Sequence, residues 1–297
     1  MMASTPTAMK GVILCADDFA VNESASRGIA MLASSRRISA TSAMVLSPRW
    51  PQDVALLHDL RGQIDVGLHL DWTSEFAAAS GHGMSLLAAM LRATLGGFGS
   101  DAAATVTRGV IERQLDAFEA HWKAPPDYVD GHQHVQQFAG IREALVQVLV
   151  GRYGSGGGPG TVNVHPPYLR ISSAAAGAFD PKSRVIAAMG AAALEKLATE
   201  AGLGVTASLL GVYDFSGDPA RYARLMEGWL SAAPVGCVIM CHPAQAAEAG
   251  DAIGVARAQE FAYLGGADFA AALALAQVQL VRGTSSQCRW VGAHSAR

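Results

Sequence analysis

Short apolar runs alternate with longer amphipathic stretches along most of this chain. The first run, Gly11–Ala16 (GVILCA), is apolar at every position, which is typical of a strand buried on both faces of a parallel sheet. Residues 39–46 and 65–70 form a second and a third run that predict strands. Further strands are expected at residues 128–130, 205–208, 235–241 and 278–281.

The stretches between these runs carry apolar residues at helical spacing. Residues 105–121 are the clearest case, because Leu115 and Phe118 fall on the same apolar face of a helix. Asn22 is a suitable N-cap for a helix over residues 22–34. We also expect helices at residues 51–61, 85–95, 140–150, 183–201, 220–232, 252–264 and 268–276.

Strand–helix units that follow one another in this way favour a parallel sheet. A length of 297 residues suits one (β/α) barrel, which typically needs about 250 residues. We therefore predict an α/β, barrel-like fold with seven or eight parallel strands, forming a single domain. Its core is expected over residues 11–281, with an insertion at residues 71–103 and short flexible termini. The glycine-rich segment 154–160 is interpreted as a surface loop, not a linker between domains.

Composition removes several classes of protein from consideration. Lys and Arg total 22 against 25 for Asp and Glu, so a net charge of −3 gives no general attraction for nucleic acid. Mean hydropathy is +0.23, but no apolar stretch approaches the roughly 20 residues that a transmembrane helix needs. No secretory signal precedes the first strand, and the four cysteines form no CxxC pair. Reduced thiols and a cytoplasmic location are therefore expected.

Residue types that bind metals or transfer protons follow the ends of several predicted strands. Because the carboxyl ends of parallel strands meet at one mouth of a barrel, these side chains are expected to converge there. The positions are Asp17 and Asp18 after the first strand, His69 in the third, Asp130, His132 and His134 after the fourth, and His242 after a late strand.

Each of these motifs also has an ordinary structural explanation. Asp17 and Asp18 could be a solvated pair that caps the next turn, but if buried they need a counter-charge such as a divalent cation. A lone histidine such as His69 is more often a core residue than a ligand. On an extended chain, His132 and His134 would face the same side and could both approach one metal ion.

Taken together, the motifs predict a site with two histidines, one aspartate and an open position for water. Such sites are typical of metal-assisted hydrolysis, so we expect one divalent metal ion and a hydrolase. A metal-dependent phosphoesterase is one alternative, although an HxH motif near the first strand is more usual in that class. A non-catalytic, metal-containing sugar-binding barrel is the other.

The same residues carry a resemblance to a known family. The chain resembles the YdjC-like (ChbG/HpnK) carbohydrate deacetylases from about residue 11 to residue 276, with its motifs in the same order. These motifs are ADDFA at residues 16–20, VGLHLDWT at 66–73, DGHQHV at 130–135, CHP at 241–243, and Arg257-x-x-Glu260.

The resemblance implies a fold related to the polysaccharide deacetylases, and hydrolysis of the N-acetyl group of an amino sugar in a carbohydrate or glycolipid. It implies that Asp18, His69 and His132 bind the metal, which is magnesium or zinc in relatives. Asp17 would then be the general base and His242 the general acid.

The roles of the three remaining candidate site residues are less directly implied. The resemblance implies that His134 and Arg257 lie behind the ligands or contact the substrate, and Trp72 is expected to line the mouth because it closely follows the third strand. The chain departs from the family at Ala20, where glycine is usual, and at Gln136, where a third histidine is frequent. The apolar composition and the resemblance together suggest a homodimer.

Overall fold

The computed structural model describes residues 9–154, 166–175 and 181–285. The two termini that were expected to be flexible lie outside these residues, as do Cys288 and nearly all of the glycine-rich segment 154–160. The three cysteines among the described residues are buried and form no disulfide.

The centre of the molecule is one parallel sheet. Its strands are β1 (Lys10–Phe19), β2 (Ala40–Ala43), β3 (Asp65–Leu70), β4 (Tyr128–Gly131), β5 (Tyr168–Leu169), β6 (Leu209–Leu210), β7 (Val238–Cys241) and β8 (Val278–Leu280). Their order is β5-β4-β3-β2-β1-β7-β6, and β8 pairs with β1. Every pair is parallel, which confirms the predicted α/β architecture.

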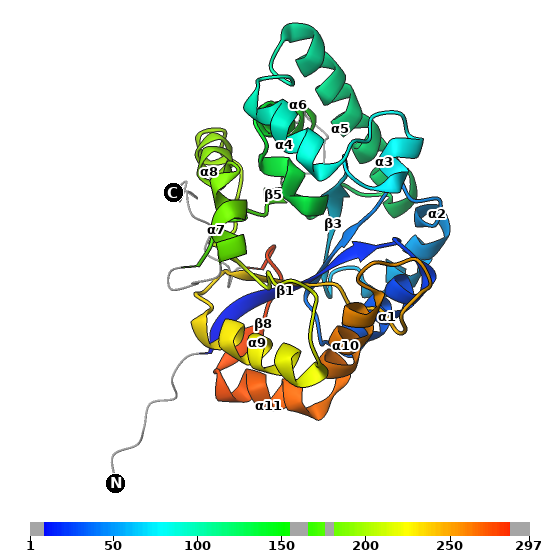
Figure 1. Ribbon diagram of the computed structural model, residues 1–297, viewed down its shortest axis with the longest axis vertical. Helices are drawn as coiled ribbons and strands as arrows, with labels where there is room; N and C mark the ends of the chain where they lie inside the picture. Colours follow the sequence, from blue (N-terminus) through cyan, green and yellow to red (C-terminus); the bar gives the residue numbers. More distant parts are fainter. Residues whose placement is uncertain (1–8, 155–165, 176–180, 286–297) are drawn as a thin grey trace, which may run out of the picture.

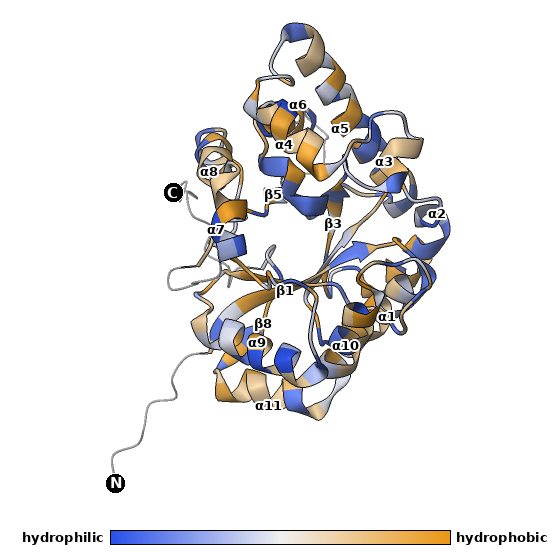
Figure 2. Cartoon of the chain, viewed as in Figure 1, coloured by the Kyte–Doolittle hydropathy of each residue, from blue (hydrophilic) through white to orange (hydrophobic). Residues whose placement is uncertain are grey.

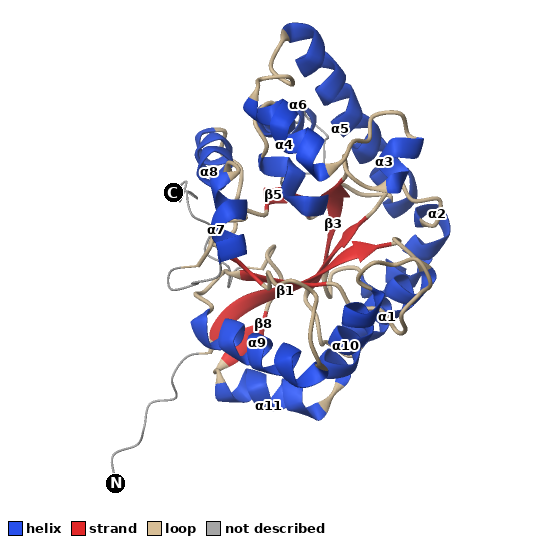
Figure 3. Ribbon diagram, viewed as in Figure 1, coloured by secondary structure: helices blue, strands red, loops and turns tan. Residues whose placement is uncertain are grey.

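Two features curl this sheet into a barrel-like shape (Figure 3). β1 is long enough to pair with two strands on the same side. Its residues Lys10–Val12 pair with β8, and Ile13–Ala16 pair with β7. Single parallel bridges, such as that between Leu169 and Val205, join the β5 edge of the sheet to the chain that leads into β6. The predicted barrel-like fold is therefore confirmed.

Helices surround the sheet on the outside (Figure 1). They are α1 (Glu23–Ser34), α2 (Trp50–Asp53), α3 (Glu75–Ala79), α4 (Leu86–Thr94), α5 (Asp101–Trp122), α6 (Ile141–Tyr153), α7 (Pro181–Ala188), α8 (Ala191–Glu200), α9 (Pro219–Ala232), α10 (Gly254–Gly265) and α11 (Ala267–Leu275), with 3-10 helices at η1 (Val54–Leu60) and η2 (His132–Gln137). As predicted, Asn22 caps α1, and its side chain accepts the backbone N–H of Ala25 at 2.8 Å.

Several predicted elements differ in detail from the structure. The helix expected at 51–61 is a single α-turn followed by η1. The helix expected at 183–201 is two helices separated at Gly190, whose φ of +127° and close approach to the Gln137 carbonyl exclude a side chain. The strand expected at 205–208 is displaced to β6, and β5 was not predicted at all.

Alternation along β1 determines which side chains reach the barrel interior. Val12, Leu14 and Ala16 belong to the core between the sheet and the helices. Ile13 and Cys15 belong to a second cluster that includes residues from β4, β5, β6 and β7, and so fills the interior. The next residue in this series, Asp17, therefore faces inward at the carboxyl end of β1, and the arrow end of β1 is hydrophilic in Figure 2.

Candidate active site

The carboxyl ends of the strands surround a cavity of about 410 Å³. Of the site residues predicted from the sequence, all line it except Trp72 and Asp130, and Asp130 lies behind His69. Arg170, Phe215 and Leu86 also line the cavity, and Leu86 begins α4 in the segment predicted to be an insertion.

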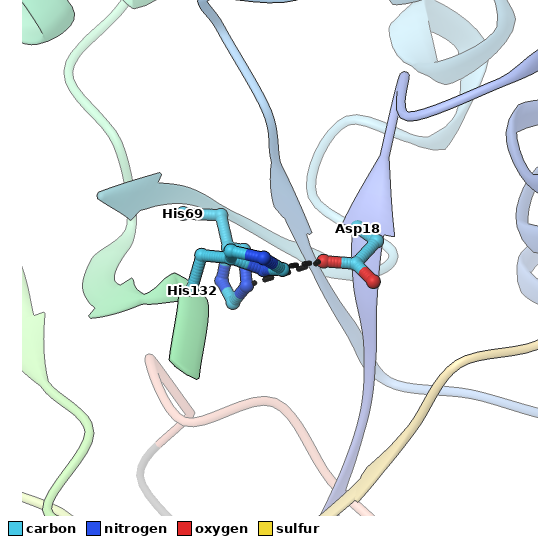
Figure 4. A group of neighbouring side chains, drawn as sticks. All are labelled: Asp18, His69 and His132. Carbon is cyan, nitrogen blue, oxygen red and sulfur yellow. Dashed lines mark ion pairs between the residues drawn. The ribbon is translucent and has the colours of Figure 1, made fainter. Parts of the chain in front are cut away.

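Asp18, His69 and His132 come together in this cavity (Figure 4). Asp18 Oδ1 lies 3.3 Å from His69 Nε2 and 3.3 Å from His132 Nδ1, and the three ligand atoms lie within 4.8 Å of one another. Among the described residues, none donates a hydrogen bond to this buried oxygen. A buried carboxylate oxygen that faces two imidazole nitrogens is suited to share a cation with them, so these residues fit a metal ion.

The other oxygen of Asp18 is held by Arg257. Arg257 Nη2 lies 2.7 Å from Asp18 Oδ2, and its Nε lies 2.8 Å from Asp251 Oδ2. Burial favours the protonated form of Asp18, but Arg257 and the two histidines outweigh burial and hold the pKa of Asp18 well below its usual value. Asp18 therefore remains an anion, with one oxygen fixed and the other available to a cation.

The chain bends sharply just after these carboxylates. Asp18 and Ala20 have φ values of 66° and 73°, in the left-handed region that glycine adopts most easily. Ala20 carries a Cβ atom in this region, so this chain keeps the bend at a conformational cost.

His69 is oriented by groups behind it. Its Nδ1 lies 2.6 Å from Asp130 Oδ1 and 3.1 Å from Ser42 Oγ, which leaves Nε2 directed at Asp18. Burial lowers the pKa of His69, but Asp130 outweighs this effect and raises it to about 10. The site thus favours positive charge, and a metal ion that binds here displaces the proton of this imidazole.

Arg170 is a site residue that the sequence analysis did not identify. It is 1% exposed, and its Nη1 lies 2.6 Å from Asp17 Oδ1 and 2.8 Å from Asp130 Oδ2. Burial raises the pKa of Asp17, but the charges of Arg170 and His69 lower it further than burial raises it. Asp17 therefore remains ionised inside the barrel. Arg170 does follow the end of a strand, but β5 is only two residues long and gives no recognisable apolar run.

A second cluster of potential metal ligands lies deeper in the barrel than Asp18, His69 and His132. Cys15, Asp17 and Asp130 each offer a ligand atom within 4.8 Å of the others. The Arg170 guanidinium already supplies positive charge between the two carboxylates, and burial raises the pKa of the Cys15 thiol well above its usual value. A neutral thiol beside a fixed guanidinium does not form a metal site.

The two histidines of the HxH motif diverge, contrary to the expectation for an extended chain. Gln133 and His134 have φ values of 52° and 63°, because the chain enters η2 directly after β4. His132 stays beside Asp18, whereas His134 Nδ1 lies 3.1 Å from Ser172 Oγ. Burial and the charge of Arg170 lower the pKa of His134 to about 3, so its ring is neutral.

His242 follows β7 on the opposite wall of the cavity. Its backbone N–H donates to Glu260 Oε2 at 2.5 Å, and its ring packs edge-on against Phe215 with centroids 5.1 Å apart. Burial lowers the pKa of His242 to about 4 and raises that of Glu260 to about 7. Glu260 was noted in the sequence only as part of a motif, and the structure shows that it holds the His242 backbone.

Trp72 does not line the cavity. It is buried in the core, where its ring packs edge-on against His82 with centroids 5.6 Å apart. The chain turns away from the mouth after β3, because the backbone N–H and C=O of Asp71 both bond to the side chain of Gln114 on α5.

The fold and the site together define a parallel α/β barrel-like protein with a histidine–carboxylate site at the carboxyl ends of its strands. The chain belongs to the YdjC-like protein family, whose model matches residues 11–275. No curated protein matches the chain in sequence.

The solved structures that match this chain include the following two. One is a proposed cellobiose-phosphate cleavage protein from Enterococcus faecalis V583, with 14% identity, a TM-score of 0.63, and coverage of 93% of this chain and 98% of that one. The other is described as T48 deacetylase with substrate, with 12% identity, a TM-score of 0.40, and coverage of 92% and 88%. The first likeness supports the fold. In the part of the chain that the structure describes, no helix has both the length and the apolar character to cross a membrane.

Proposed function

We propose that this chain is a metal-dependent hydrolase that removes an N-acetyl group from an amino sugar in a carbohydrate or glycolipid. The observation that carries the proposal is the convergence of His69 and His132 on one oxygen of Asp18 that accepts no hydrogen bond among the described residues, beside the ionised Asp17. Membership of the YdjC-like family supports a carbohydrate-processing role. The bond to be broken is the C–N bond of a linear amide.

Asp18, His69 and His132 would hold one divalent cation, magnesium or zinc. When bound, such an ion lowers the pKa of a water molecule and polarises a carbonyl group. Asp130 would keep the His69 ring in the orientation that binding needs, through its 2.6 Å contact with Nδ1. Arg257 would hold Asp18 in place from the other side.

Asp17 is the proposed general base. As an ionised carboxylate at the mouth, it can take a proton from the water that attacks the carbonyl carbon. Arg170 fixes its position through the 2.6 Å contact and keeps it ionised. The new C–O bond then produces acetate as the C–N bond breaks.

His242 is the proposed general acid for the departing nitrogen. Its lowered pKa leaves the ring neutral before reaction, so it must take up a proton, the one that Asp17 removes from the water, before it can donate one to the nitrogen. Asp17 and Asp18 both favour that uptake, because their negative charges raise the pKa of His242 against the effect of burial. Phe215 limits the movement of the ring from one side.

The first prediction concerns Asp17→Asn. Purified protein supplied with Mg²⁺ or Zn²⁺ is expected to release acetate from N-acetylglucosamine oligosaccharides or from glycolipids with an acetylated amino sugar. The variant keeps Asp18, His69 and His132, so elemental analysis should find the metal retained while acetate release falls about 10²–10⁴-fold. Asp59→Asn, at an exposed aspartate, is the matched control and should leave the rate unchanged.

Other outcomes of the same assay would contradict the proposal. Folded, metal-loaded wild-type protein that releases no acetate from the panel would contradict it directly. Release of phosphate from small phosphoesters would indicate the phosphoesterase alternative. Sugar binding without turnover, equal in wild type and Asp17→Asn, would indicate a binding protein.

Three wider features remain predictions that accompany this proposal. We propose that the chain forms a single catalytic domain, that it is a homodimer, and that it is cytoplasmic. Sedimentation of the purified chain tests the homodimer, and limited proteolysis tests whether the core resists cleavage as one unit.

A further inference from the structure

Among the described residues, His134 is the one histidine of the cavity that has no part in the proposed metal site or proton transfers. It is buried and lines the cavity, with its Nδ1 3.1 Å from Ser172 Oγ. It follows Gln133 in a left-handed turn, and two consecutive residues in this conformation strain the backbone. Such strain persists only where the surroundings hold the backbone in place, and it directs His134 away from His132.

The hydrogen bonds behind His134 have a defined direction. Gln136 Nε2 lies 3.2 Å from the carbonyl oxygen of Arg170, and a carbonyl oxygen can only accept a hydrogen bond. The NH₂ group of the Gln136 amide must therefore point toward the Arg170 carbonyl. The same nitrogen donates a hydrogen bond to Ser172 Oγ at 3.4 Å. The Ser172 oxygen is then the acceptor in that bond, and its own proton is free to point elsewhere.

The proton of Ser172 can reach Nδ1 of His134. If Ser172 donates to Nδ1, this nitrogen is unprotonated, and a neutral imidazole carries its single proton on Nε2. Within the described parts of the chain, the His134 ring makes no hydrogen bond through Nε2, and the ring lines the cavity. The N–H therefore faces the cavity with its hydrogen bond still to be made.

We infer that Gln136 and Ser172 hold His134 as the Nε2–H tautomer, so that it donates a hydrogen bond to an acceptor oxygen of the substrate. His134 is then a specificity-determining residue and not a metal ligand. The substrate side of this inference rests on the proposed function, whereas the tautomer does not. Gln136 is the residue that gives the chain of hydrogen bonds its direction.

The tautomer can be measured without any substrate. In protein with ¹⁵N-labelled histidine, long-range ¹H–¹⁵N spectra at neutral pH should show His134 with Nε2 protonated and Nδ1 unprotonated. Ser172→Ala removes the donor to Nδ1 and should produce a mixture of tautomers. A protonated Nδ1 in the wild-type protein, or a ring unchanged by Ser172→Ala, would overturn the inference.

Two substitutions test the donor role. His134→Gln keeps an N–H group and should retain kcat/KM to within a few-fold, whereas His134→Leu should lose about tenfold or more, the effect of one hydrogen bond. Circular dichroism and metal content should match wild type in both variants. Equal losses in the two would overturn the donor role. A wild-type protein that is inactive on every substrate would count against the proposed function, and the spectra would still decide the tautomer.

Discussion

Arg170 shows how one residue can determine the charge state of a whole site. Its guanidinium lies between Asp17 and Asp130, and both carboxylates are almost completely buried. Asp17 is the proposed base, and Asp130 orients His69. A single buried cation thus connects the proposed base to the carboxylate that orients the proposed metal ligand His69.

The second prediction is that Arg170→Met destabilises the protein strongly. Methionine fills similar space but leaves two buried carboxylates without their partner, which typically costs about 3–5 kcal/mol. Urea unfolding measures this cost. Arg27→Met is the matched control, because Arg27 pairs with Glu23 on the exposed face of α1 and such pairs contribute about 0–1 kcal/mol. Similar effects for the two variants would show that Arg170 is not a buried counter-ion of this kind.

At the scale of elements, a glycine on β3 leaves room for a tyrosine ring on β4. Gly67 faces the barrel interior two residues before His69, and a Cβ atom there would lie 2.5–2.7 Å from the ring of Tyr128. Tyr128 in turn stacks on Tyr168 and contacts Cys15, directly below Asp17. The glycine therefore allows the aromatic layer that supports the floor of the site.

The third prediction concerns this contact. Gly67→Ala should destabilise the fold by about 1–3 kcal/mol, because the tyrosine ring is packed on both sides and cannot move aside easily. Gly151→Ala, in α6 with open space around it, should instead be neutral or stabilise by about 0.5–1 kcal/mol. Thermal or urea unfolding of the two variants compares them. Equal stability of both variants would show that the barrel interior tolerates the extra methyl group.

The elements also show what the sequence can and cannot predict. β1, β3 and β7 are apolar runs whose positions were predictable to within a few residues, and so were the carboxylates and histidines at their ends. β5 and β6 are two residues long, too short for any periodic pattern. Arg170 was missed for this reason, and because a counter-ion 153 residues from its partner leaves no local signal.

The course of the chain beyond a strand end was equally unpredictable. His132 and His134 were expected to face one side, but that holds only for an extended chain, and η2 begins at His132. Trp72 was expected at the mouth, but Asp71 bonds to Gln114 and turns the chain into the core. The direction of His134 is decided by backbone dihedral angles that the residue types do not reveal. The position of Trp72 is decided by a hydrogen-bond partner of Asp71 that is distant in the sequence.

At the scale of the whole molecule, the buried carboxylates at the two ends of the barrel differ in the positive charges that surround them. At the carboxyl ends of the strands, Arg170 and Arg257 hold Asp17 and Asp18 ionised. At the amino ends, Asp65 is buried and accepts hydrogen bonds from Thr284 and Tyr168, while Nη1 of Arg282 is 3.9 Å away. Burial raises the pKa of Asp65 there.

Asp127 lies at the same end and gives the last prediction. Burial and the nearby charge of Asp65 raise the pKa of Asp127 to about 6, above the value of about 4 in an unfolded chain. The folded protein thus binds this proton more tightly than the unfolded chain does, so Asp127 makes the protein less stable as the pH rises from about 4 to 6. Asp127→Asn keeps an acceptor for the Val66 N–H and removes the titration.

The variant should match wild type near pH 4 and exceed it by about 1–3 kcal/mol at pH 7, the free energy of a pKa shift of this size. Urea unfolding at the two pH values measures the difference, and the exposed Asp59→Asn should show none. The stability difference between Asp127→Asn and wild type could also prove to be independent of pH. In that case, ionisation of the buried carboxylates at the amino ends of the strands would not lower the free energy of unfolding. The contrast between the two ends would then come from Arg170 and Arg257 alone.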